Sequence, residues 1–170
     1  MAENQMPKVE QLEQHRWLRQ LIGEWVYTMD EPMPEAGQHM PSVERVRALG
    51  DVWIQGETQT EMPGMGPVVM QLTLGYDAQK KRFVGTWLGS MMTYLWVYDG
   101  ELDAAGKSLT LNAEGPSMAG EGMAKYQDII TIVGPDERTL TSQQLQADGT
   151  WKRFMKATYK RKEENATVSL

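Results

Sequence analysis

The side chains best suited to bind another molecule are the methionines, which are frequent in this chain. Its 170 residues include 13 Met, no Cys and two His, His15 and His39. Without Cys the chain cannot form thiolate nucleophiles, disulfides or zinc–sulfur sites. Methionine is unbranched and polarizable, and it recurs at surfaces that adapt to apolar ligands. This composition favours binding of a small apolar molecule. His39 is either a polar contact for that molecule or, as we favour, a solvated side chain of a loop.

A second group of reactive side chains lies near the C-terminus, where polar and apolar residues alternate. Arg153, Tyr159 and Arg161 share one parity, which predicts that they lie on one face of a strand. If that face is buried, an Arg on it needs an acidic partner, such as Asp128, or an anionic ligand. We favour a structural ion pair here. An enzyme with a polar cavity built on Arg153 and Tyr159 is the alternative.

Other signatures of catalysis are weak. Residues 115–119, Gly-Pro-Ser-Met-Ala, resemble a nucleophile elbow, but that motif needs a following helix and none is expected there. The segment 63–67 is a hairpin loop and not a phosphate cradle, since no helix begins after it. A copper site would need Met and His side chains to converge on one ion. We expect no catalytic residue, no metal and no cofactor, and an enzyme is the less favoured class.

The charge balance limits the expected partners. The net charge is −6, with 41% hydrophobic and 24% charged residues, values typical of a globular domain. An acidic chain is a poor match for nucleic acid or for an anionic membrane surface, so neither partner is expected. The N-terminus lacks a basic start followed by an apolar run, and no segment stays apolar for the length of a bilayer. The expected location is the cytoplasm.

Hydrophobic periodicity divides the chain into one helix and a series of strands. Apolar residues recur at helical spacing from Val9 to Ile22, and Gly23 ends the pattern, which predicts a helix over 9–22. Beyond Gly23 the period changes to two, as is typical of strands. Strands are expected at 24–29, 42–49, 52–62, 68–76, 82–89, 93–98, 108–113, 124–133, 139–146 and 151–161. We expect one domain over 9–161, between a disordered segment 1–8 and a flexible tail 162–170.

The connections between these strands predict their topology. Short segments rich in Asp, Gly and Pro lie at 77–81, 99–107, 134–137 and 147–149. Short turns join antiparallel neighbours, and no helical crossover interrupts about ten consecutive strands. Closing such a sheet removes its unpaired edges. We therefore predict an all-β fold, a closed up-and-down antiparallel barrel of about ten strands whose N-terminal helix caps one end. A two-sheet sandwich is the alternative.

Strand direction also predicts where the methionines lie, because the loops of an up-and-down barrel alternate between its two ends. Eight of the 13 Met lie in or beside the loops of one end: Met33, Met40, Met62, Met65, Met91, Met92, Met118 and Met123. The opposite end has polar turns and the helix. Exposed apolar clusters mark ligand entrances or protein contacts, whereas methionines that fold inward would only fill the core.

The favoured function is binding of a small, largely apolar ligand in the barrel lumen through this Met-rich end. The side chains expected to contact the ligand are Met62, Met65, Met91, Met92, Met118, Met123, Trp87, Tyr94, Trp96, His39, Arg153 and Tyr159. The alternative is a non-catalytic module that uses the same surface to form a homodimer or to bind a partner protein.

The segment that contains Gly23 and Trp25 resembles the Gly-x-Trp opening of lipocalins and other calycins. In those proteins a Trp on the first strand fills the barrel floor, and a basic residue of the last strand packs over it. The resemblance implies these structural roles for Trp25 and Arg161. A cation over an aromatic ring contributes about 0.5–2 kcal/mol.

A longer pattern is similar to an uncharacterised bacterial family, domain of unknown function 1579, with a lipocalin-like barrel. The residues that carry this likeness are His15-x-x-Leu18-x-x-Leu21-x-Gly23-x-Trp25, Leu74-Gly75-Tyr76-Asp77 and Arg82-Phe83-Val84-Gly85-Thr86-Trp87-x-Gly89-Ser90-Met91-Met92. The likeness covers nearly all of residues 10–162. It implies the barrel fold and carries no activity or site with it.

Overall fold

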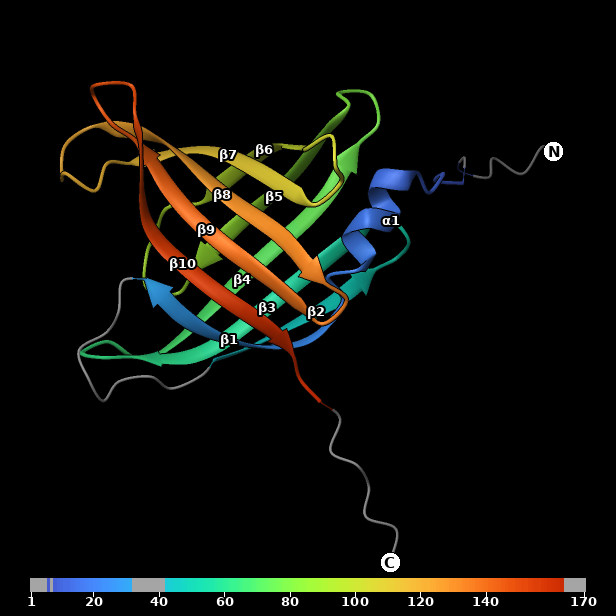
Figure 1. The fold of residues 1–170 in the computed structure, drawn as a ribbon, viewed down its shortest axis with the longest axis horizontal. Coiled ribbons are helices and arrows are strands. Elements are labelled where there is room, and N and C mark those ends of the chain that lie inside the picture. Colours follow the sequence, from blue (N-terminus) through green and yellow to red (C-terminus); the bar gives the residue numbers. More distant parts are fainter. Residues whose placement is uncertain (1–5, 7, 32–41, 164–170) are drawn as a thin grey trace, which may run out of the picture.

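The alternating segments fold into ten strands preceded by one short helix in the computed structural model, which describes residues 6, 8–31 and 42–163 (Figure 1). The helix is α1 (Glu13–Arg19). The strands are β1 (Gly23–Glu31), β2 (Ser42–Leu49), β3 (Trp53–Met62), β4 (Gly66–Asp77), β5 (Arg82–Gly89), β6 (Trp96–Leu102), β7 (Ser108–Pro116), β8 (Met123–Gly134), β9 (Glu137–Leu145) and β10 (Trp151–Arg161). The expected segments 1–8 and 162–170 lie mostly outside the described residues.

These strands form a closed barrel. Each strand pairs with its neighbours in the sequence, and β1 also pairs with β10. The ring closes in antiparallel register, with Trp25 opposite Arg161 and Tyr27 opposite Tyr159. Closure gives every described strand two hydrogen-bonded neighbours and leaves no open edge among them. The predicted up-and-down barrel is therefore confirmed, and the sandwich alternative is wrong.

Strand direction defines two ends of the barrel. The helix end comprises α1 and the turns at 50–52, 78–81, 103–107 and 135–136, and it lies to the right in Figure 1. The methionine end comprises the loops at 63–65, 90–95, 117–122 and 146–150. Side chains of each strand alternate between the lumen and the outer surface, so each strand contributes inward-facing residues at both ends.

Helix α1 is shorter than the predicted 9–22. The backbone of Leu12 is extended, with φ −90° and ψ 172°, and Val9 is exposed, so the apolar spacing before Leu12 is not used for packing. The His15 Nδ1 accepts a hydrogen bond from the Leu12 N–H at 2.9 Å, which leaves Nε2 to donate to the Tyr76 carbonyl at 2.9 Å. His15 is buried and therefore lies at the seam of helix and barrel. Within the described ranges, no helix has the length and apolar character needed to cross a bilayer.

Strand β6 starts and ends later than predicted. The sequence predicts a turn at Asp99 and Gly100, but both lie inside β6, opposite Asn112 and Leu111. A Cβ at Gly100 would lie 2.8 Å from the Thr110 carbonyl oxygen. This prediction is wrong because glycine is required here by the close approach of two strands and not by a turn.

Strand β10 contains a bulge that the sequence pattern does not reveal. Arg153 lies opposite Gln143, whereas Met155 lies opposite Ser142, so one extra residue is accommodated between them. An extra residue reverses the alternation of side chains along a strand. Arg153 is therefore exposed on the outer face, while Tyr159 is buried inside. The prediction that Arg153 and Tyr159 share a face is wrong.

Candidate functional site

The helix end of the lumen is closed by Trp25 on β1. Its side chain is 1% exposed, and its Nε1–H donates a hydrogen bond to the Leu21 carbonyl at 2.9 Å. The Arg161 guanidinium lies 4.2 Å from the ring centroid and donates to the Ile22 carbonyl at 2.7 Å. This is the packing that the lipocalin resemblance implies for Trp25 and Arg161, and it forms a sealed floor.

A buried ion pair lies just inside the floor. Arg138 on β9 is 3% exposed and pairs with Glu44 on β2. Its guanidinium lies 4.8 Å from the Trp25 ring centroid and 4.0 Å from that of Tyr159. Tyr27 stacks on Tyr159 with centroids 4.7 Å apart. Burial raises the pKa of the Tyr159 phenol well above its usual value, so this ring stays neutral in the physiological range.

Arg138 and Glu44 are not predicted as site residues from the sequence, although their strand parity indicates that both side chains face inward. Glu44 has the parity of buried Val46, and Arg138 has the parity of Leu140. Charged residues on amphipathic strands are usually exposed, so parity alone does not distinguish these two from their neighbours. Their burial can be inferred only once the pairing of β1 with β10 closes the barrel and leaves just these two strands between β2 and β9.

Asp128 on β8 faces the same lumen in a different environment. Its carboxylate accepts hydrogen bonds from the hydroxyls of Tyr98 and Ser142, the second at 2.5 Å. No Lys or Arg of the described residues forms an ion pair with it. Burial raises the pKa of the Asp128 carboxyl, and the bonds from Ser142 and Tyr98 oppose this shift. Asp128 is partly buried within the ring of strands.

The inward-facing apolar side chains change in exposure along the barrel. Near the helix end most are buried, as for Trp25, Ile54, Leu74, Phe83, Leu109 and Leu111, while Tyr76, Ile132 and Leu140 are partly buried. From the middle of the barrel to the methionine end most are only partly buried, namely Met29, Met70, Leu72, Trp87, Trp96 and Met155. Val68, Ala113 and Tyr126 are buried exceptions. The exposure gradient indicates that inward positions are more accessible toward the methionine end.

Six of the eight methionines predicted at one end belong to the described residues. The order of the strands places all six at the methionine end. Met62 ends β3, Met65 follows it, Met91 and Met92 follow β5, Met118 follows β7, and Met123 begins β8. Five of them are between 36% and 65% exposed and do not fill the core. Met91 turns inward, where its thioether packs against Gly89 near the Trp87 ring.

Aromatic side chains surround Trp96 beside this rim. The Trp96 ring lies against Gly115, where a Cβ would collide with it. Tyr94 and Tyr126 meet the Trp96 ring edge-on, with centroids 5.1 Å and 4.9 Å away. The Trp96 Nε1–H donates to the Met92 sulfur at 3.3 Å. Edge-to-face contacts fix the orientation of rings, so Trp96 is held as one wall of the entrance.

One predicted site residue is not part of this lumen. Arg153 lies on the outer face. His39, like Met33 and Met40, lies outside the described residues. Among the residues that the structure describes, no three His, Asp or Glu side chains are grouped as metal ligands.

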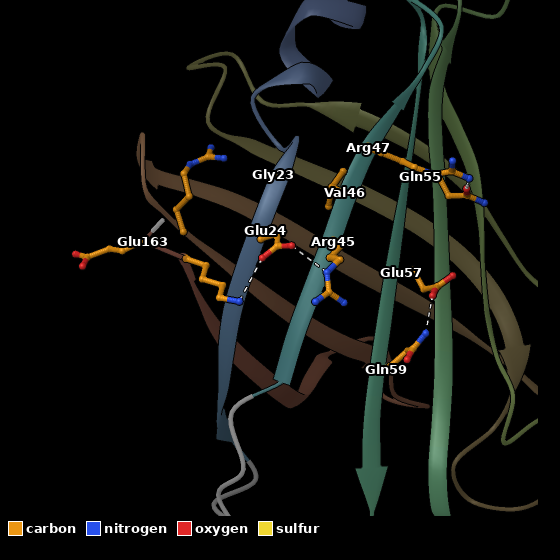
Figure 2. A pocket seen from close by; sticks show the side chains of 11 residues that line it. Gly23, Glu24, Arg45, Val46, Arg47, Gln55, Glu57, Gln59 and Glu163 are labelled. Carbon is orange, nitrogen blue, oxygen red and sulfur yellow. Dashed lines mark hydrogen bonds and ion pairs between the residues drawn. The ribbon is translucent and has the colours of Figure 1, made fainter. Parts of the chain in front are cut away.

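Two hollows lie on the outer surface. The larger, of about 980 Å³, covers β1, β2 and β3 beside the end of β10, and its lining is mostly charged or amide side chains (Figure 2). Glu24 in this hollow pairs with both Arg45 and Lys162. The smaller hollow, of about 530 Å³, includes Tyr94 and Trp151. Because charges in the larger hollow pair with one another, we place the candidate binding site in the lumen.

A family model described as "Protein of unknown function (DUF1579)" matches residues 10–161. The chain belongs to this family. The resemblance to DUF1579 noted from the sequence is thereby confirmed. None of the curated proteins compared with the chain matches it. Among solved structures, the DUF1579 chain is similar to a redesigned beta barrel, with 15% identity over 87% of this chain and 96% of that chain, at a TM-score of 0.44.

Proposed function

We propose that this DUF1579 barrel binds a small, largely apolar molecule in its lumen and that the molecule enters through the methionine end. The exposure gradient of the inward-facing side chains carries the proposal, since most of these positions are buried near α1 and most are partly exposed toward the other end. A barrel of about eight strands is filled by its side chains or holds one small ligand, and the interior widens with strand number. Ten strands therefore favour space for a ligand.

The walls of the accessible half suit an apolar ligand. Met70 and Leu72 lie on β4 and Met29 on β1, and Trp87, opposite Leu72 on β5, adds an aromatic surface. Burial of a CH₂ group contributes about 0.8 kcal/mol, so a ten-carbon chain gains at most about 8 kcal/mol before the cost of association. The expected dissociation constant is therefore micromolar or weaker.

The test fills the lumen by mutation and compares it with a matched change outside. Leu72→Trp adds volume to the middle of the lumen, whereas Leu88→Trp adds the same ring on the outer face of the adjacent strand, where Leu88 is exposed. Binding is measured by the fluorescence of N-phenyl-1-naphthylamine, with circular dichroism as the check on folding. We expect wild type and Leu88→Trp to bind the probe alike, and folded Leu72→Trp to bind at least about tenfold more weakly. No probe binding by wild type, or equal binding by folded Leu72→Trp, would contradict the proposal.

Self-association through the methionine end is a second candidate function. The observation that favours it is the exposure of Met118 and Met123 on the β7–β8 loop and of Leu95 beside β6, because contiguous exposed apolar residues mark protein contacts. Sedimentation velocity across the micromolar range tests it. A dimer that Met118→Gln/Met123→Gln dissociates supports this candidate, and a monomer at tens of micromolar contradicts it.

We also propose that the protein is located in the cytoplasm of a bacterium, as expected from the sequence. The likeness to a bacterial family and the acidic charge balance, −6 overall, support it. Fractionation of bacterial cells that express an epitope-tagged chain tests this location. Recovery in the soluble cytoplasmic fraction is expected, and recovery in the periplasm or with membranes would contradict it.

A further inference from the structure

The charges that face the lumen do not balance. Two carboxylates, those of Glu44 and Asp128, face it together with the guanidinium of Arg138. Arg138 pairs with Glu44, so among the described residues Asp128 has only the neutral hydroxyls of Tyr98 and Ser142 as partners. Desolvation strongly disfavours an isolated carboxylate in a barrel interior. The enclosed part of the lumen therefore lacks one positive charge among the described residues. Lys152, opposite Gln144 on the inward side, is exposed at the methionine end.

The two polar groups differ in whether a ligand could reach them. The Arg138 guanidinium is enclosed between the rings of Trp25 and Tyr159, and its Nε, which has no hydrogen-bond partner among the described residues, is buried. Asp128 instead retains accessible surface. An anionic ligand is thus disfavoured at Arg138, while a cationic ligand has an accessible acceptor at Asp128.

The strand register places apolar wall beside this acceptor. Ser142 lies opposite Asp128 on one side and opposite Met155 on the other, and Leu111 lies opposite Asp128 on β7. Each carboxylate oxygen of Asp128 takes one hydroxyl bond, and each can accept a second bond. A donor that arrives from the lumen can therefore bind without displacing Tyr98 or Ser142.

We propose that Asp128 is the polar anchor of the lumen and that the ligand is an apolar molecule with a protonated amine at one end. This inference rests on the proposed binding function. The ammonium supplies the missing charge and donates to the Asp128 carboxylate, and the apolar body extends along Met155, Leu72 and Trp87 toward the methionine end. Hydrogen bonds between charged partners are stronger than neutral ones, so the amine is preferred over an alcohol of the same length.

A linked proton makes this preference measurable. Burial raises the pKa of Asp128, and a bound ammonium would lower that pKa again, so binding of the amine releases a proton in the window where unliganded Asp128 is partly protonated. The other titratable or charged groups that face this part of the lumen are Tyr27, Glu44, Tyr98, Tyr126, Arg138 and Tyr159, with Lys152 on the same side of β10 but exposed at the methionine end. The phenols of Tyr98 and Tyr159 have a pKa raised well above the usual value, so they do not titrate near neutral pH.

The experiment compares three probes of equal chain length: decylamine, 1-decanol and decanoate. Each displaces N-phenyl-1-naphthylamine from the wild type, from Asp128→Asn and from Asp99→Asn, whose carboxylate lies exposed on the outer face. We expect wild type and Asp99→Asn to bind decylamine about tenfold more tightly than 1-decanol, a ratio that corresponds to about 1.4 kcal/mol. Asp128→Asn is expected to bind the two within about threefold, with its affinity for 1-decanol retained.

The outcomes separate this inference from the function on which it rests. If none of the probes binds, the proposed function fails and the inference fails with it. If wild type binds decylamine and 1-decanol equally, or prefers decanoate, lumen binding stands and the amine preference is overturned. If folded Asp128→Asn keeps the preference, Asp128 is not the anchor.

A measurement on the wild type alone keeps the inference testable if Asp128→Asn does not fold. The affinity for decylamine should rise with pH through the range in which Asp128 loses its proton, while that for 1-decanol should stay level. Calorimetry in two buffers of different ionisation enthalpy should show a proton released with decylamine and none with 1-decanol. Equal pH profiles for the two probes would overturn the inference.

Discussion

The two ends of the barrel use different kinds of side chain. At the helix end, Trp25 is held between Arg138 and Arg161, and His15 fixes α1 through two hydrogen bonds. At the methionine end, thioethers such as that of Met118 face solvent. Directional contacts favour one rigid arrangement, whereas thioethers adapt to many. The difference suggests that stability is concentrated at the helix end and adaptability at the methionine end.

The strongest test of this comparison breaks the buried ion pair. Arg138→Met leaves the carboxylate of Glu44 buried without its partner, and loss of one member of a buried pair costs about 3–5 kcal/mol. We expect a decrease of that size in the free energy of unfolding, measured by urea denaturation. Glu44→Gln combined with Arg138→Met should recover part of the loss, because the uncompensated charge is then absent.

The matched control is Arg82→Met on the outer wall. Arg82 also bonds carboxylates, those of Asp99 and Glu101, but both partners are well exposed. Exposed ion pairs contribute about 0–1 kcal/mol, so Arg82→Met should change stability by no more than that. If Arg82→Met and Arg138→Met lowered the free energy of unfolding equally, the buried ion pair at the floor would contribute no more to stability than the exposed pairs of the outer wall.

A smaller effect on the free energy of unfolding is expected from alanine substitutions at two glycines, one packed against backbone and the other against a side chain. A Cβ at Gly85 would overlap the Thr73 carbonyl oxygen, which belongs to the backbone of β4, whereas a Cβ at Gly115 would meet the Trp96 ring. Overpacking costs about 1–3 kcal/mol, with the higher values where the neighbour cannot move. Gly85→Ala should therefore cost about 3 kcal/mol and Gly115→Ala about 1 kcal/mol in urea unfolding.

Tryptophan fluorescence distinguishes these two variants further. Gly115→Ala should shift the emission spectrum, because the Trp96 ring has to turn away from the wall at the entrance. A loss from Gly115→Ala as large as that from Gly85→Ala would mean that the methionine end is as rigid as the centre of the barrel.

Much of the fold follows from the sequence because the signals are local. Period-two alternation and short turns predict ten strands in order, and the Gly23 and Trp25 motif identifies the floor. The errors arise where a nonlocal contact decides the structure. Gly100 is required by the approach of β7, and the bulge before Met155 appears only in the pairing of β10 with β9.

The candidate site is harder to predict than the fold. The methionine end follows from strand direction alone, so its residues can be named from the order of strands and loops along the chain. Arg138 and Glu44 lie 94 positions apart, and their pairing depends on the closure of β1 on β10, which leaves only these two strands between β2 and β9. Parity identifies Asp128 as inward-facing. Its lack of a basic partner, however, results from the pairing of Arg138 with Glu44.

A modest effect is expected from Asp128→Asn on stability as a function of pH. Burial raises the pKa of Asp128 in the folded protein above the ordinary value of 3.8, so the folded state binds this proton more tightly than the unfolded chain. Its contribution to stability is present at low pH and is lost as the pH rises from about 4 through the raised pKa. Asp128→Asn should remove this dependence, so its stability relative to wild type should increase with pH until the carboxyl is fully ionised. Urea unfolding from pH 4 to 8 measures it, and parallel curves would contradict the raised pKa.

The smallest effect is expected at the rim. Met118 and Met123 are 65% and 60% exposed, and exposed substitutions usually change stability by less than about 0.5 kcal/mol. Met118→Gln/Met123→Gln should therefore unfold at the same urea concentration as wild type but bind N-phenyl-1-naphthylamine more weakly, because glutamine has a polar amide in place of an apolar thioether. The matched control is Val133→Gln, an exposed apolar residue near the helix end, which should leave probe binding unchanged. Equal weakening by both substitutions would show that probe binding does not depend on which end of the barrel is made polar, and entry through the methionine end would then be wrong.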